Sequence, residues 1–144
     1  MNWHQTCPHC GVVTTAYTVN LNGPMVTAFV AFAEARIRLG HPLVKGELEL
    51  DNSQYGNFQK LRHFGLIEPR ANRSWEMTSL GWDFLRGREP VPNPAGQFGN
   101  STLPSGHPAW ATHKVARHYI RIADVLPEAW KQRAEYAAEK AGAA

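Results

Sequence analysis

The strongest constraint on the fold is a series of helix start and stop signals in the middle of the chain. Apolar residues recur every three or four positions over residues 24–39, which predicts a helix with a wide buried face that ends at Gly40. Pro24 suits the first helical position, because the N–H group that it lacks has no helical partner there. Asn22 or Gly23 can cap this helix.

A second helix is expected after a short extended piece at residues 41–45 and one helical turn within residues 46–50. Asp51 is a candidate N-cap, and Gln54 stands three positions later in a near capping box. The helix runs to the residue before Gly65. Its predicted core side consists of Leu50, Tyr55, Phe58, Leu61 and Phe64.

A β-hairpin follows the second helix. Residues 66–68 and 74–77 have the pattern of short strands, and turn-forming residues at 69–73 separate them. Thr78 then begins a further short helix over residues 79–86. The order helix, extended piece, turn, helix and hairpin is typical of a winged helix-turn-helix, a mainly α fold with a small β-hairpin wing.

Two stretches within this region resemble a known class of protein. Residues 57–68 (NFQKLRHFGLIE) and 75–87 (WEMTSLGWDFLRG) resemble the recognition helix, wing and following helix of winged-helix proteins. They resemble still more closely small phage and prokaryotic proteins in which an N-terminal Cys-Pro-x-Cys-Gly segment precedes this block. The resemblance covers about residues 1–92. It implies a DNA-binding protein of transcription regulation in the cytoplasm of a bacterium or a phage-infected host.

Composition divides the chain into four expected segments. A Cys-x-x-Cys knuckle and strand occupy residues 1–21, the winged-helix domain residues 22–88, a Pro/Gly-rich linker residues 89–109, and a C-terminal extension residues 110–144. Within the extension, residues 110–122 are compatible with a hairpin or a helix. A clearer helix over residues 127–141 carries an apolar stripe made of Leu126, Trp130, Ala134, Ala137 and Ala141. The stripe predicts either a homodimer interface or docking onto the same chain.

The second helix has a polar face without an acidic residue. Amide side chains pair with adenine, and Lys and Arg pair with guanine edges or phosphates, so this face predicts binding to duplex DNA. Gly56 lowers helix propensity by about 1 kcal/mol relative to alanine, in keeping with a close approach of another backbone. The predicted DNA-binding residues, which include two arginines of the hairpin turn, are Asn52, Ser53, Gly56, Asn57, Lys60, Arg62, His63, Arg70 and Arg73.

Alternatives to DNA binding stay open. The formal net charge of +3 permits a polyanionic partner without requiring one. The same face is compatible with a solvated surface, or with a protein-interaction module or phage-type inhibitor that binds a host or partner protein while residues 89–108 wrap around it. Trp75 and Trp82 suit a base-stacking platform or, more simply, buried anchors beneath the hairpin.

The cysteine pair predicts a metal site only in part. Cys7 and Cys10 have the spacing of half a zinc knuckle, but structural zinc takes four ligands and the chain has no further cysteine. The missing ligands would have to come from histidines or from a second subunit. Free thiols, a disulfide and a redox pair are the alternatives. The histidines available are His4, His9, His41, His107, His113 and His118.

Motifs for other functions are missing from the sequence. There is no Gly-rich phosphate loop and no His-Glu-x-x-His, so a non-enzymatic protein is expected, with His63 a base only in principle. No run of eighteen apolar residues occurs, and residues 1–10 lack the basic and apolar regions of a secretory signal. We therefore expect neither a membrane span nor a secreted protein.

Overall fold

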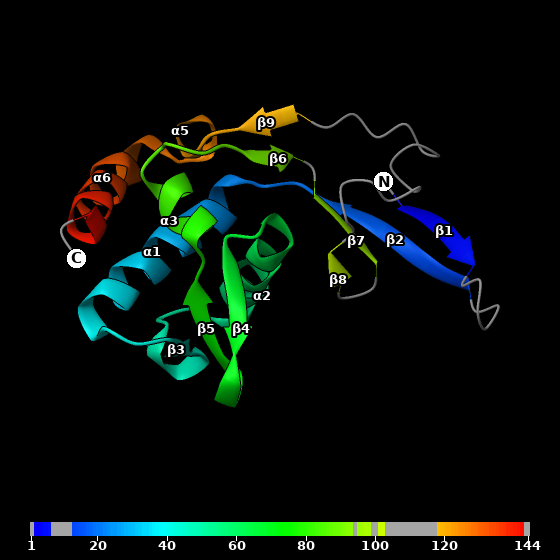
Figure 1. Cartoon of the computed structure of the whole chain (residues 1–144), viewed down its shortest axis with the longest axis horizontal. Helices are drawn as coiled ribbons and strands as arrows, with labels where there is room; N and C mark the ends of the chain where they lie inside the picture. The colour runs from blue at the N-terminus through cyan, green and yellow to red at the C-terminus, as the bar shows by residue number, and fades with distance from the viewer. Residues whose placement is uncertain (1, 7–12, 94, 99–100, 103–117, 143–144) are drawn as a thin grey trace.

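The computed structural model of the chain describes residues 2–6, 13–93, 95–98, 101–102 and 118–142 (Figure 1). The predicted class, mainly helical with a small antiparallel sheet, is confirmed. The helices are α1 (Gly23–Leu39), α2 (Asn52–Gln59), α3 (Ser79–Leu85), α5 (Ile122–Val125) and α6 (Glu128–Gly142), and three 3-10 turns are η1 (Lys45–Glu47), η2 (Lys60–Phe64) and η3 (Ala71–Arg73). The strands are β1 (Asn2–Thr6), β2 (Val13–Val19), β3 (Leu43–Val44), β4 (Ile67–Arg70), β5 (Ser74–Met77), β6 (Val91–Asn93), β7 (Ala95–Phe98), β8 (Ser101–Thr102) and β9 (His118–Ile120).

Helix α1 lies at the centre of the molecule, between α2 and the β4–β5 hairpin on one side and α6 on the other (Figure 1). Its predicted limits are confirmed. The Asn22 side chain accepts a 3.0 Å hydrogen bond from the Met25 N–H, and Gly40 ends the helix with a φ angle of +76°. The buried face consists of Met25, Val26, Ala28, Phe29, Val30, Phe32, Ala33 and Ala35.

The second predicted helix begins where expected but changes geometry before it ends. Asp51 caps α2, and its carboxylate and the Gln54 side chain form the predicted capping box. From Lys60 onward the chain continues as the 3-10 turn η2 until Gly65, whose φ angle is +75°. A 3-10 turn has three residues instead of 3.6, so side chains after Gln59 point in directions that an α-helical projection does not predict.

The predicted hairpin forms, and β3 joins it in a three-stranded antiparallel sheet of order β3-β5-β4. Phe58 of α2 is fully buried and connects the sheet to α1. Its ring centroid lies 5.0 Å from that of Phe32 and 5.8 Å from that of Trp75. Trp75 is only 6% exposed, so it is a buried anchor beneath the hairpin, and Trp82 is half-buried.

The interpretation of residues 89–109 as a linker is wrong for its described part. Strand β6 pairs with β9, and β7 pairs with β2 and β8. Val91 is fully buried, and the Asn93 side chain accepts a 2.9 Å hydrogen bond from the Leu21 N–H. Prolines are tolerated in short edge strands, so a proline-rich composition did not exclude pairing. Of the ambiguous segment 110–122, residues 118–120 form β9, and residues 110–117 lie outside the described residues.

The apolar stripe of the C-terminal helix packs within the chain. Helix α6, at the predicted position, lies against α1 and α3 and buries Ala134 and Ala137 (Figure 1). Leu126, which precedes α6, is buried as well. Arg133 of α6 forms a bidentate ion pair with Glu34 of α1. Of the two alternatives that the stripe predicts, the structure shows docking onto the same chain. None of the helices in the described ranges is sufficiently long and apolar to cross a membrane.

Candidate nucleic-acid interface

A groove separates α2 from the tip of the β4–β5 hairpin. We call it the basic groove; its volume is about 450 Å³, and it is lined by Val44, Lys45, Gly46, Tyr55, Gln59, Asn72 and Arg73. These residues contribute two cations, two amides and a phenol, and no carboxylate. The register of β3 against β5, with Val44 opposite Ser74, brings Lys45 of η1 close to Arg73 of the hairpin.

Lys45 and Tyr55, two polar residues of this groove, are held in place. The Lys45 ammonium donates a 3.0 Å hydrogen bond to the Asn52 side chain and lies 5.0 Å from the Tyr55 ring centroid. The Tyr55 hydroxyl oxygen accepts a 2.8 Å hydrogen bond from the Trp75 indole N–H. Because this bond uses an acceptor site, the hydroxyl proton of Tyr55 can still be donated to a ligand.

The hairpin tip presents its two arginines differently. Asn72 and Arg73 have φ angles of +60° and +57°, in the left-handed region. The Arg70 guanidinium lies 2.5 Å from the Glu68 carboxylate, which compensates its charge. Arg73 is exposed and has no ion pair within the described residues. Of the two arginines, Arg73 is therefore better placed to bind an anion.

The predicted DNA-binding residues do not share one surface. Five of them are exposed: Asn52, Ser53, Lys60, Arg70 and Arg73. Gly56, Asn57 and Arg62 are half-buried, and the Arg62 Nε atom is buried with no hydrogen-bond partner in the described part of the chain. A Cβ atom built on Gly56 has no heavy-atom neighbour within 4 Å. Gly56 therefore avoids no clash within the described part of this chain.

The placement of His63 on the polar face was wrong. Only 5% of this residue is exposed. The change from α2 to η2 rotates it away from the predicted face, and η2 packs against β7 and β8, which the sequence had placed in a linker. Burial, together with the nearby positive charges of Arg62 and Lys60, lowers the pKa of His63 from 6.5 to about 4. A neutral buried histidine is a poor phosphate ligand.

Sequence reasoning missed Lys45 and the hydroxyl of Tyr55. Tyr55 was expected only as a core residue, and it is half-buried with its ring against Phe58 at a centroid distance of 5.9 Å. The proximity of Lys45 to Arg73 depends on strand register, which no local pattern in the sequence predicts. Of the residues that line this groove, Arg73 had been predicted to bind DNA.

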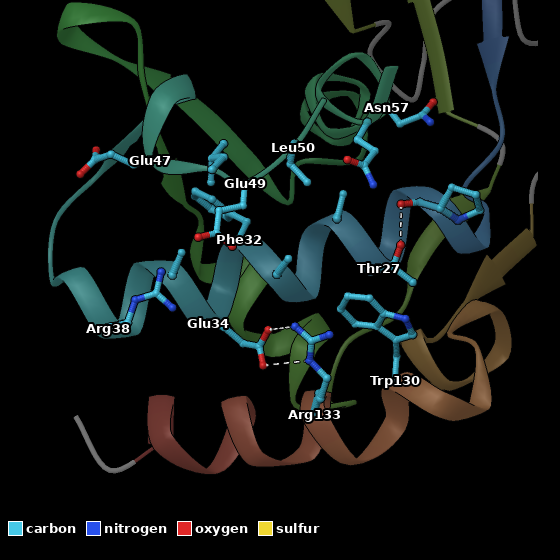
Figure 2. Close-up of a pocket in the computed structure, with 16 residues that line it drawn as sticks. Thr27, Phe32, Glu34, Arg38, Glu47, Glu49, Leu50, Asn57, Trp130 and Arg133 are labelled. Carbon is cyan, nitrogen blue, oxygen red and sulfur yellow. Dashed lines mark hydrogen bonds and ion pairs between the residues drawn. The ribbon is translucent and has the colours of Figure 1, made fainter. Parts of the chain in front are cut away.

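A second groove lies on another side of α2 (Figure 2). Its volume is about 300 Å³, and it is bounded by α1, α6, residues 47–50 and the α2 side chains of Gln54 and Asn57. Asn57, predicted to contact DNA, thus lines this second groove. The two grooves have no lining residue in common.

Neither the potential metal ligands nor a comparison with known proteins adds information about the function of the groove. The zinc prediction concerns Cys7 and Cys10, which lie outside the described residues. Among the residues that are described, no three His, Cys, Asp or Glu side chains gather in a metal-binding group. No protein family model, curated protein or solved structure matches the chain.

Proposed function

We propose that residues 22–88 form a winged helix and that the protein binds duplex DNA through α2 and the β4–β5 hairpin, in the regulation of transcription. The element order supports this proposal, since α1 is followed by β3, a turn, the capped helix α2 and an antiparallel hairpin. In winged-helix proteins the second of these helices enters the major groove and the hairpin contacts the backbone.

The observation that carries the proposal is the charge of the basic groove. It is lined by Lys45 and Arg73 without a carboxylate, and phosphate contacts of this kind supply most of the sequence-independent affinity of DNA-binding proteins. Exposed Asn52 and Ser53, in the first turn of α2, are in the position from which such helices contact base edges. Lys60, exposed at the end of α2, provides a further phosphate contact.

The test is fluorescence anisotropy with a labelled random-sequence duplex at a series of salt concentrations. The double variant Lys45→Ala/Arg73→Asn removes both cations of the groove, and asparagine tolerates the left-handed backbone of Arg73. We expect weaker binding and a log–log salt slope that is smaller by about 1.8, because each lost phosphate contact changes the slope by about 0.9. Lys60→Ala is expected to reduce the slope by about 0.9.

The matched control is Lys140→Ala, which removes one cation from the exposed side of α6. It is expected to leave the slope unchanged. Equal affinities and slopes for the wild type and the double variant would contradict DNA binding by this groove. A slope near zero in the wild-type protein would favour the alternative, a protein partner.

A further inference from the structure

The second groove follows α1 for most of its length, and we call it the α1 groove (Figure 2). Its lining runs from Pro24 to Arg38, about 21 Å along the helix axis at 1.5 Å per residue. The floor is apolar, and most of its side chains are small. It consists of Phe32 and three alanines, Ala28, Ala31 and Ala35. Trp130 of α6 forms part of one wall, and Leu48 and Leu50 form part of the other.

Some polar groups of this groove are already paired within the protein. Glu34 and Arg133 bind each other bidentately, and the Arg133 guanidinium also lies 3.8 Å from the Trp130 ring centroid. Glu47 accepts a 3.0 Å hydrogen bond from the Val44 N–H. These groups shape the walls and have no need of a ligand.

Two charged groups of the lining lack such partners. Arg38 and Glu49 are both exposed, and neither side chain makes a hydrogen bond or an ion pair with any described residue. Figure 2 shows them toward one end of the groove, while Thr27, Asn57 and Trp130 lie toward the other end. The groove thus has one end where Arg38 and Glu49 are unpaired beside the hydrogen-bonded Glu47, an apolar floor, and a neutral polar end.

We propose that the α1 groove binds a small zwitterion with an apolar body, of the class of a free amino acid with an aliphatic or aromatic side chain. The ligand carboxylate pairs with Arg38, its ammonium group pairs with Glu49, and its side chain covers the alanine floor toward Trp130. A ligand with only one charge would leave either Arg38 or Glu49 beside a like charge or unpaired. The volume of about 300 Å³ lies at the small end of the range for ligand sites.

The inference is independent of the proposed function, because the charged groups of the α1 groove are distinct from the cations of the basic groove. The test is titration of the full-length ¹⁵N-labelled protein with leucine, phenylalanine or tryptophan, followed by amide chemical shifts. We expect saturable shifts at residues of this groove for at least one of the three, with a Kd of about 1 mM or tighter for so small a ligand. N-acetylphenylalanine and phenethylamine each lack one of the two charges of phenylalanine. We expect the affinity of each analogue to be lower than that of phenylalanine by a factor of about ten or more.

Three variants locate the ligand. Arg38→Gln and Glu49→Gln remove one partner each and are expected to weaken binding about tenfold, with Arg88→Gln and Glu139→Gln as matched controls at exposed positions outside the groove. Ala31→Leu fills the floor of the groove and is expected to abolish binding. Thermal unfolding of each variant checks that it is folded.

The proposal is overturned by any of four results. One is the absence of saturable shifts for all three amino acids, and another is equal binding of the two singly charged analogues. The third is unchanged binding by folded Ala31→Leu, which would place the ligand elsewhere. Sedimentation of the wild type and Ala31→Leu distinguishes a further case: a dimer that the variant abolishes would make a second copy of the chain the occupant and would also overturn the proposal.

Discussion

The indole N–H of Trp75 donates a 2.8 Å hydrogen bond to the hydroxyl oxygen of Tyr55. This bond joins β5 of the hairpin to α2, two elements that are otherwise connected through the buried ring of Phe58. It fixes the hydroxyl that faces the basic groove and the tryptophan that anchors the hairpin. The distance between α2 and the hairpin tip therefore depends on a specific polar contact as well as on packing.

Removing that hydroxyl tests the importance of the contact. In Tyr55→Phe the Trp75 N–H loses its partner while almost completely shielded from water, and we expect the free energy of unfolding to fall by about 1–2 kcal/mol. Urea unfolding measures the change. Tyr136→Phe, at a tyrosine that is 58% exposed, is the control and is expected to change the stability by less than about 0.5 kcal/mol.

The low pKa of His63 predicts acid sensitivity in a defined range. With a folded-state pKa of about 4 against an unfolded value of 6.5, the unfolded chain binds a proton that the folded chain does not. Stability from this residue is complete above pH 6.5 and falls by about 3 kcal/mol as the pH decreases to 4. Urea unfolding between pH 7 and pH 4 measures the loss.

His63→Gln removes the titrating group and is expected to flatten this pH dependence, whatever its stability at pH 7. The control is His118→Gln, at an exposed histidine, which is expected to keep the wild-type pH dependence. If the free energy of unfolding of His63→Gln depended on pH as strongly as that of the wild type, another group would be responsible for the acid sensitivity.

Replacement of glycine by alanine is expected to have opposite effects on stability at Gly56 and at Gly81. Gly56→Ala in α2 meets open space and is expected to stabilise the protein by about 1 kcal/mol, because alanine favours a helix. If α2 enters the major groove, the added methyl group also weakens DNA binding. A variant that is more stable and binds DNA less tightly would link Gly56 to function.

Gly81→Ala in α3 is expected to be strongly destabilising. The new Cβ atom would lie 2.6 Å from the Met77 sulfur and still closer to the Leu66 carbonyl oxygen, which is backbone and cannot turn away. We expect a loss of about 3 kcal/mol or more in thermal or urea unfolding. Similar stability for the two alanine variants would contradict the close packing of Gly81 against Leu66 and Met77.

Arg36 of α1 and Glu76 of β5 form a partly buried ion pair, with 2.7 and 3.2 Å hydrogen bonds. Burial alone would raise the pKa of Glu76, but hydrogen bonds from Arg36 and from the Met77 N–H lower it overall. Arg36→Met is expected to cost about 2 kcal/mol at pH 7, because the carboxylate loses its charged partner.

A lowered carboxyl pKa stabilises the folded state above the unfolded pKa, and this contribution disappears as the pH falls. The difference between wild type and Arg36→Met is therefore expected to shrink below about pH 4. Arg38→Met is the matched control on the same helix, since Arg38 forms no ion pair with the described residues. Equal losses in both variants would contradict a role for the pair.

Local signals in the sequence predicted most of the helix limits. Asn22, Asp51 and Thr78 cap helices as expected, and Gly40 and Gly65 end them. These signals are reliable because each depends on hydrogen bonds within a few residues of the chain. The docking of α6 was also foreseen as one of two alternatives, since an alanine-rich stripe permits close packing of helices.

Features that depend on distant residues were not predicted. The pairing of β6 with β9 and of β7 with β2 joins segments far apart in sequence, and a composition rich in proline and glycine concealed it. The burial of His63 has two causes of this kind. One is the 3-10 geometry of η2, and the other is the packing of β7 and β8 against η2. The basic groove likewise requires the register of β3 against β5, so its residues Lys45 and Arg73 appeared unrelated in sequence.

The contact between α1 and α6 has a consequence for how the protein folds during synthesis. Glu34 and Arg133 are 99 positions apart, so the face of α1 that α6 covers stays open until α6 has left the ribosome. Contacts between residues so distant in sequence form late and slow the folding reaction. A nascent chain stalled after residue 90 would thus expose part of its central helix, and it would be the natural target of a chaperone.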